Sequence, residues 1–455
     1  MSLDQALAYA KTNHQRFLDE LIQLVRIPSI STDPENKEAM QQAAIYIAHQ
    51  LTGLGFLKVQ TFPTGLHPIV YGERMDGGKD APTILIYGHY DVQPTDPIDL
   101  WVSDPFSPQV RDGFLYGRGA SDMKGQVIAS LKAIEAVLSQ GKLPVNVKYL
   151  VEGEEEIGSP NLTSFLKEHA ELLKCDIALN PDSGMISPED PTIVYSLRGL
   201  AYFEIRIYGP DHDLHSGVFG GVVHNPAQAL CELIAGMHDS QNRITLPGFY
   251  DHVNPISDEE RVQLARLPMN DQYYLDQTGA PAVWGEAGYS ATERIGARPT
   301  LEVHGLYSGF TGKGSKTVIP SWAMAKISTR LVPNQDPDDV RKGMMAYMQQ
   351  HAPDTIRWEV IPMQGGFASL SDVKVPTAIA LADALESVWG KPPLYKREGG
   401  SVPVVADMQK YLGVDSVITG FGLPDDNIHA PNERLHLRTW ELGIQALIRF
   451  FFNLS

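Results

Sequence analysis

The sequence contains only two cysteines, Cys175 and Cys231, among its 455 residues. So few cysteines exclude a disulfide framework and favour a reducing compartment, so we expect a cytoplasmic protein. Basic residues are also fewer than acidic ones. The sequence has 37 Lys and Arg against 55 Asp and Glu, which gives a formal net charge of −18. No long Lys/Arg cluster interrupts this acidic charge, which argues against nucleic acid or an anionic membrane as a partner.

Long apolar runs and several familiar hydrolase motifs are missing as well. No apolar stretch approaches the roughly 18 residues of a spanning helix, and the N-terminus lacks the pattern of a signal peptide. The motifs GxSxG and HExxH do not occur, which argues against a nucleophile-elbow serine hydrolase and a zincin. The segment 309–317 superficially resembles a phosphate loop, but its final glycine is followed by Ser315 where that motif has lysine.

Short apolar runs that alternate with helical patterns fill the two ends of the chain. Buried strands are predicted at 83–87, 145–151, 176–179 and 416–419, and helices at 37–54, 126–139, 161–173, 377–388 and 439–451. This alternation predicts an α/β fold, with an open, mostly parallel sheet flanked by helices. The central runs 201–207 and 322–328 instead alternate polar and apolar residues, as in an antiparallel sheet with one solvated face. We therefore expect a catalytic α/β domain formed by residues 1–196 and 365–455, with an inserted α+β domain at 197–364.

Five polar clusters follow predicted strands of the α/β domain, at 88–91, 117–125, 152–159, 180–184 and 427–433. Open parallel sheets bind ligands at this edge. Taken singly, each cluster has a plain structural explanation: Asp122 could cap a helix, and a run of four glutamates is usually a solvated surface. The run 152–156 follows a strand that we expect to be buried, however, where the repulsion between its carboxylates favours a bound cation.

Together the five clusters supply two histidines, a potential bridging aspartate and further carboxylates. This set is sufficient for two metal ions, each with one histidine and one terminal carboxylate, that share Asp122. One more carboxylate remains available as a base. Mixed imidazole and carboxylate ligands favour Zn²⁺, with Mn²⁺ as the alternative. Paired ions of this kind generate hydroxide at neutral pH and polarise a carbonyl.

The order and content of these clusters resemble the M20 family of co-catalytic metallopeptidases over nearly the whole chain. The segments 213–221, 316–320, 330–334 and 397–403 further resemble the branch of nonspecific dipeptidases and carnosinase-like enzymes. The resemblance implies a zinc-exopeptidase-like catalytic domain and two divalent ions per subunit. It also implies that the inserted domain is a lid through which the protein forms a homodimer.

The resemblance also implies a role for individual residues. His89, Asp122 and Asp182 would hold one ion, Asp122, Glu156 and His429 would hold the other, and Asp91 would orient His89. Glu155 would be the general base on the bridging hydroxide and would later protonate the leaving amine. His215 and Thr317 would reach the active site of the partner subunit, where His215 would stabilise the oxyanion, and Arg330 would bind the substrate carboxylate. Glu398, Gly400 and Ser401 would line the substrate pocket.

The expected reaction is therefore hydrolysis of the peptide bond of a dipeptide or another short peptide. An N-acyl-amino-acid deacylase is the alternative enzyme, since the same metal site can cleave any amide. A metal-loaded binding protein without activity is the alternative outside enzymes, and the presence of Glu155 argues against it. The sequence departs from the dipeptidase pattern in one place: the branch has another substrate-site histidine after Arg357, yet none occurs between His351 and His429.

Overall fold

The computed structural model describes residues 2–400 and 402–454, and the chain divides into two compact units. Unit 1 comprises Met1–Tyr195, Ser371–Tyr395 and Asp407–Ser455, and unit 2 comprises Ser196–Leu370 and Lys396–Ala406. Both ends of the chain thus belong to unit 1. The folding-domain boundaries expected from the sequence, 1–196, 197–364 and 365–455, stay a prediction.

Unit 1 is built around a mixed sheet with the strand order β1-β2-β6-β3-β7-β17-β8. Its central strands β6, β3, β7 and β17 run parallel, and antiparallel pairing is confined to the β1, β2 and β8 sides. The expected open, mostly parallel sheet is confirmed. The strands are β1 (Leu57–Phe62), β2 (Ile69–Arg74), β6 (Asn146–Glu152), β3 (Thr83–His89), β7 (Ile177–Asn180), β17 (Ser416–Ile418) and β8 (Thr192–Leu197).

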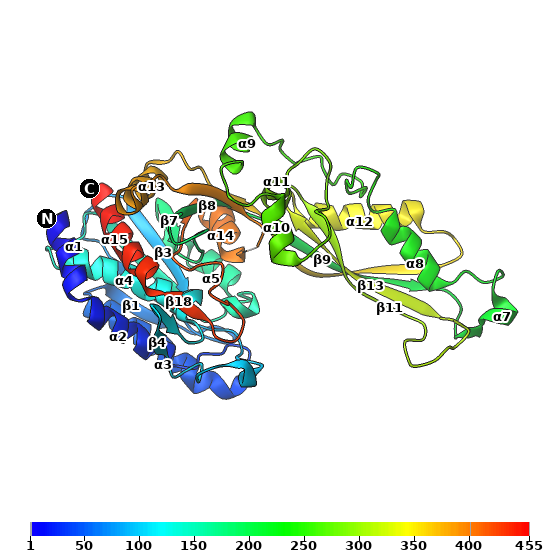
Figure 1. Ribbon diagram of the computed structural model, residues 1–455, viewed down its shortest axis with the longest axis horizontal. Helices are drawn as coiled ribbons and strands as arrows, with labels where there is room; N and C mark the ends of the chain where they lie inside the picture. The colour runs from blue at the N-terminus through cyan, green and yellow to red at the C-terminus, as the bar shows by residue number, and fades with distance from the viewer. Residues whose placement is uncertain (1, 401, 455) are drawn as a thin grey trace. The chain divides into compact units, whose positions relative to one another are not determined.

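Helices from both ends of the chain cover this sheet. They include α1 (Leu3–Thr12), α2 (His14–Val25), α3 (Lys37–Gly53), α4 (Gly125–Leu138), α13 (Pro376–Trp389) and α15 (Leu437–Asn453). Figure 1 shows the C-terminal α15 beside α4, α1 and α13, and apolar side chains from all of these helices share one core. The single helix predicted at 161–173 is wrong: α5 (Leu162–Glu168) and α6 (Ala170–Leu173) are separated at His169, whose backbone is not helical.

Unit 2 has an antiparallel sheet with the order β11-β13-β9-β14. The strands are β11 (Thr300–Ser308), β13 (Trp322–Leu331), β9 (Gly199–Tyr208) and β14 (Arg357–Gly366). Helices α8 (Pro226–Ala235) and α12 (Pro337–His351) pack on one face, where Ile205, Ile327 and Met344 are buried with them. The alternation read from the sequence places Ile205 and Ile327 on the inward face of their strands.

Smaller elements complete the two units. In unit 2 they are β10 (Leu214–His215), α7 (Ser216–Phe219), β12 (Val318–Ile319), α9 (Asp258–Leu264), α10 (Asp271–Thr278), α11 (Ala291–Ala297) and β15 (Ser369–Leu370). In unit 1, β4 (Gln109–Arg111), β5 (Phe114–Tyr116) and β18 (Arg434–His436) form a small sheet. The elements β16 (Leu394–Glu398) and α14 (Pro403–Asp407) flank the segment 399–402.

Candidate metal centre

The ends of the parallel strands in unit 1 position most of the candidate ligands. Strand β3 ends at His89, β7 ends two residues before Asp182, and the turn after β6 carries Glu155 and Glu156. Parallel strands end at the same edge of a sheet, so these side chains converge. Asp122 comes from the segment Ala120–Lys124 that leads into α4, and its peptide bond to Met123 is cis.

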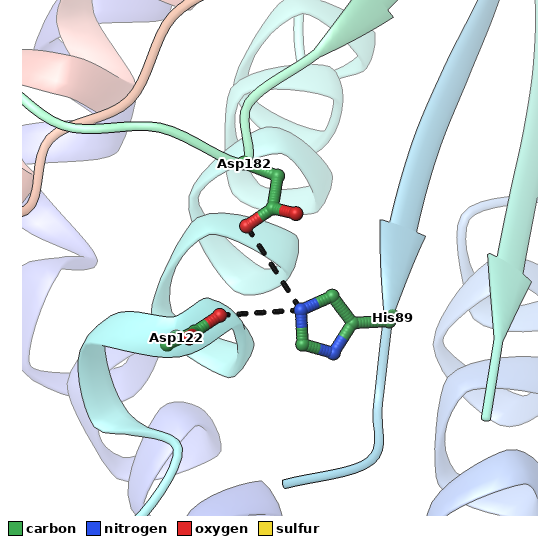
Figure 2. A group of neighbouring side chains, drawn as sticks. All are labelled: His89, Asp122 and Asp182. Carbon is green, nitrogen blue, oxygen red and sulfur yellow. Dashed lines mark hydrogen bonds and ion pairs between the residues drawn. The ribbon is translucent and has the colours of Figure 1, made fainter. Parts of the chain in front are cut away.

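Two groups of side chains that could hold a metal ion occur among residues 2–400 and 402–454. The first contains His89, Asp122 and Asp182, and Figure 2 shows both aspartates directed at the imidazole. The Nε2 atom of His89 lies 3.2 Å from Asp122 Oδ1 and 3.9 Å from Asp182 Oδ1. In the second group, Nε2 of His429 lies 2.9 Å from Asp122 Oδ2 and 3.3 Å from Glu156 Oε2.

The Asp122 carboxylate belongs to both groups, with Oδ1 directed to His89 and Oδ2 to His429. One carboxylate can therefore contact two ions through its two oxygens. Ligands about 2.0–2.1 Å from a tetrahedral ion lie roughly 3.3 Å from each other, close to the measured separations. Both the donor atoms and their spacing fit a pair of divalent ions.

Asp91 is fully buried and contacts both His89 and the acidic turn. His89 Nδ1 lies 3.1 Å from the Asp91 backbone oxygen and 3.5 Å from its Oδ1, so Nε2 is left facing the ligands. The carboxylate of Asp91 also accepts hydrogen bonds from the backbone N–H of Glu155, at 3.3 Å, and of Glu156, at 3.0 Å. Asp91 thus positions the imidazole chiefly through its backbone oxygen, and its carboxylate positions the turn that carries two further carboxylates.

The cluster holds an excess of buried negative charge. Burial, together with neighbouring carboxylates such as Asp122 and Glu156, raises the pKa of Asp182 to about 7 and that of Glu155 to about 9. Hydrogen bonds to Asp122 and Glu156 raise the pKa of His429 to about 10. Such a concentration of buried carboxylates is a charge that divalent cations would compensate.

The acidic run after β6 is not a solvated surface. Glu152 and Glu154 are each 1% exposed. Glu154 accepts hydrogen bonds from Thr64 Oγ1, His67 N and Asn161 Nδ2, and Glu152 accepts from Tyr87 and Ser159. These two carboxylates shape the loop. The turn that follows presents Glu155 and Glu156 at the ligand cluster.

Glu433 was not assigned a role from the sequence, yet it holds the loop that carries Asp122. Its Oε1 accepts hydrogen bonds from Ser121 N, at 3.0 Å, and Asp122 N, at 3.1 Å. Its Oε2 accepts from Gly119 N, at 2.9 Å, and from Arg118, at 2.7 Å. Glu433 follows His429 by four residues, and this short spacing was the available signal that it belongs to the site.

We expect Glu433→Gln to weaken metal binding by about 10- to 100-fold, because the amide can no longer accept from all four donors and the Asp122 loop loosens. Titration of the metal-free protein against a competing chelator measures this affinity, and circular dichroism verifies the fold. Glu386→Gln, an exposed position on α13, is the matched control. Unchanged affinity in Glu433→Gln would show that the loop keeps its geometry without this carboxylate.

The remaining predicted site residues lie in unit 2. His215 and Thr317 are neighbours where β10 pairs antiparallel with β12, and Ser216 N donates to Thr317 O. Gly217 N donates to Nδ1 of His215, at 2.9 Å, so a neutral ring carries its proton on Nε2. Arg330 is partly buried on β13.

The last residue of β16 and the segment that follows it are the other pocket residues expected from the sequence. Glu398 accepts a hydrogen bond from Gly399 N and forms an ion pair of 2.7 Å with Lys396. The Gly400 carbonyl accepts from Arg198 N. Ser401 lies outside the described residues.

A parallel α/β sheet whose strand ends carry two groups of one histidine and two carboxylates is the arrangement of a metallohydrolase. Residues 85–453 match the model of peptidase family M20/M25/M40. The chain therefore belongs to this family of hydrolases, as its motifs predicted.

Known relatives support this assignment over the whole chain. The Cys-Gly metallodipeptidase DUG1 of Candida albicans is 32% identical, with 95% of this chain and 93% of the relative aligned. Human Beta-Ala-His dipeptidase is 29% identical over 100% of this chain and 93% of its own. A solved M20 family metallo-carboxypeptidase of Sulfolobus solfataricus is 33% identical with a TM-score of 0.84, over 96% of this chain and 99% of its own.

None of the helices within residues 2–400 and 402–454 combines the length and the apolar character needed to cross a membrane.

Proposed function

We propose that this protein is a metal-dependent dipeptidase with two ions per subunit. The observation that carries the proposal is the Asp122 carboxylate, whose two oxygens face two separate histidines. Relatives that are named dipeptidases and align over nearly the full chain favour free peptides as substrates over acylated amino acids.

His89, Asp122 and Asp182 would hold one ion, and Asp122, Glu156 and His429 would hold the other, with Zn²⁺ favoured and Mn²⁺ as the alternative. Such a pair of ions lowers the pKa of water and polarises a carbonyl. Asp91 would keep Nε2 of His89 aimed at the ligands.

Glu155 belongs to neither ligand group, which leaves its carboxylate available for proton transfer. Its position next to Glu156 in the turn after β6 would bring it close to the attacking water. We assign it the removal of a proton from that water and the return of the proton to the leaving amine.

Residues of unit 2 would bind and polarise the substrate. Arg330 offers a planar fork of donors for the terminal carboxylate of a dipeptide. Nε2–H of His215 suits a hydrogen bond to the developing oxyanion, and Thr317 lies next to it at the paired strands β10 and β12. Glu398 would lie near the free amine of the substrate, and Gly400 and Ser401 would line the pocket.

Exposed apolar side chains on unit 2 support a homodimer in which His215 acts in the partner's active site. Strand β11 is at the edge of its sheet, and Leu306 and Tyr307 on this strand are 58% and 52% exposed. An edge strand with exposed apolar residues is suited to pairing with a second copy.

The thiols of Cys175 and Cys231 are not joined to each other, which supports the proposed cytoplasmic location.

We expect the wild-type protein to be a dimer and Leu306→Asp to be a monomer with little hydrolysis, because the charge would be desolvated at the interface. Size-exclusion chromatography with light scattering measures the mass, and activity is assayed on the same fractions. Val262→Asp on α9, whose valine is 65% exposed, is the control. A wild-type monomer with full activity would be incompatible with His215 acting in trans.

The substrate class is tested with free dipeptides against N-acetyl and N-succinyl amino acids, each with Zn²⁺ and with Mn²⁺. We expect the dipeptides to be hydrolysed and the acylated amino acids to be poor substrates. Turnover of the acylated amino acids alone would replace the dipeptidase by the deacylase, the alternative that the relatives do not favour.

A further inference from the structure

Unit 2 contains a cavity of ≈ 730 Å³ that is lined entirely by its own residues. Its floor is the polar face of the sheet, where Glu302, Ser328 and Arg330 lie. Its wall comes from the segment between α8 and β11, with the apolar side chains of Leu275, Val283, Trp284 and Ile295. Cavities of this size accommodate small organic ligands.

The register of the sheet places Arg330 at the end of this floor. Thr300 pairs with Arg330 and Glu302 pairs with Ser328, so these side chains share one face of β11 and β13. The alternate residues of β13, such as Ile327, are buried in the core on the opposite face. The cavity therefore has a guanidinium group at a fixed place in its floor.

Buried polar contacts hold the wall in place. Arg298 forms two hydrogen bonds with Glu286, at 2.7 and 2.8 Å, and its guanidinium lies over the ring of Tyr289. Ser290 and Glu293 form a capping box that starts α11. These contacts fix a wall on which the ring of His238 meets Trp284 edge-on, at 5.4 Å between centroids. Trp284 remains 62% exposed, so much of its apolar surface is available at the cavity.

A second arginine lies at the floor of the cavity, together with Arg330 and Glu302. Arg198 also lines the cavity, is only 9% exposed, and donates from Nε to the Gly399 carbonyl, at 2.9 Å. Burial and the nearby charge of Arg330 lower the pKa of Arg198 to about 10. The carboxylates of Glu398 and Glu302 offset part of this effect. The apolar wall thus begins in the same cavity as the two guanidinium groups.

We infer that this cavity is the subsite for the side chain of the substrate's C-terminal residue and selects a large apolar or aromatic residue there. The inference rests on the proposed dipeptidase function. The terminal carboxylate and the side chain of that residue branch from the same Cα atom. When the carboxylate contacts Arg330, the side chain therefore lies within reach of the apolar wall, where a glycine would leave the volume unfilled.

A series of alanyl dipeptides tests this subsite on the full-length, metal-loaded enzyme. Ala-Gly, Ala-Ala, Ala-Asp, Ala-Leu and Ala-Phe differ only in the C-terminal side chain. We expect kcat/KM for Ala-Leu and Ala-Phe to exceed that for Ala-Gly by at least about 10-fold, the discrimination that an apolar pocket provides. Equal or better hydrolysis of Ala-Gly or Ala-Asp would overturn the inference and leave the dipeptidase function intact.

Variants of the wall add a second measurement. Trp284→Ala should reduce the ratio of kcat/KM between Ala-Phe and Ala-Ala several-fold, whereas Val262→Ala, an equally exposed apolar position on α9, should leave it unchanged. An unchanged ratio in Trp284→Ala would contradict the assignment of the wall. If no dipeptide is hydrolysed by the wild-type enzyme, the proposed function fails and the subsite fails with it.

Discussion

Replacement of Glu155 by glutamine is expected to reduce peptide hydrolysis by about 10²- to 10⁴-fold while the chain still binds two divalent ions. The amide has nearly the size of the carboxylate but cannot accept the proton of the attacking water. Glu155 lies outside both ligand groups, so the loss should appear in kcat and leave the metal content unchanged. Stopped assays on a dipeptide and metal analysis of the same preparation measure both quantities.

Glu168→Gln serves as the control for this variant, because it makes the same chemical change at an exposed position of α5. Two results would contradict the assigned role. Activity that survives in Glu155→Gln would require another base, and loss of an ion together with activity would make Glu155 a ligand.

The second large effect is expected from Asp122→Asn, which should reduce the bound ions from two to none and abolish hydrolysis. Asp122 contributes one oxygen to each group, and an amide offers a single, neutral acceptor in its place. Asp182→Asn changes only the first group and is expected to keep one ion. Metal titration followed by elemental analysis distinguishes the two variants.

The comparison of these variants tests the shared ligand directly. If Asp122→Asn and Asp182→Asn each lose one ion, Asp122 does not bridge. Conversely, two ions retained in Asp122→Asn would place the ligands elsewhere. Either result would contradict the proposal that the Asp122 carboxylate is shared by two ions.

The sequence predicted the parallel sheet and the grouping of the candidate ligands because both depend on local patterns. A buried apolar run defines a strand, and polar residues that follow parallel strands must meet at one edge, as His89 and Asp182 do. The break at His169 escaped prediction because the apolar period continues across it and only the backbone departs from the helix.

Contacts between distant segments escaped prediction for a different reason. Glu433 binds the backbone of residues 119–122 across more than three hundred positions, and no local pattern encodes the partner of a buried carboxylate. The three donors to Glu154 likewise come from Thr64, His67 and Asn161, which share no local pattern with it. The apolar wall of the unit 2 cavity is scattered over α10, α11 and the chain between them, without a period of its own.

The contact between Asp122 and His429 joins positions 307 residues apart, on either side of unit 2 in the sequence. Ions held there would act as a cross-link that closes a very long loop, and they would bind the folded chain far better than the unfolded one. By thermodynamic linkage, each ion would then add stability that grows with the logarithm of its free concentration. The availability of metal in the cell would thereby govern the lifetime of the folded protein as well as its rate of catalysis.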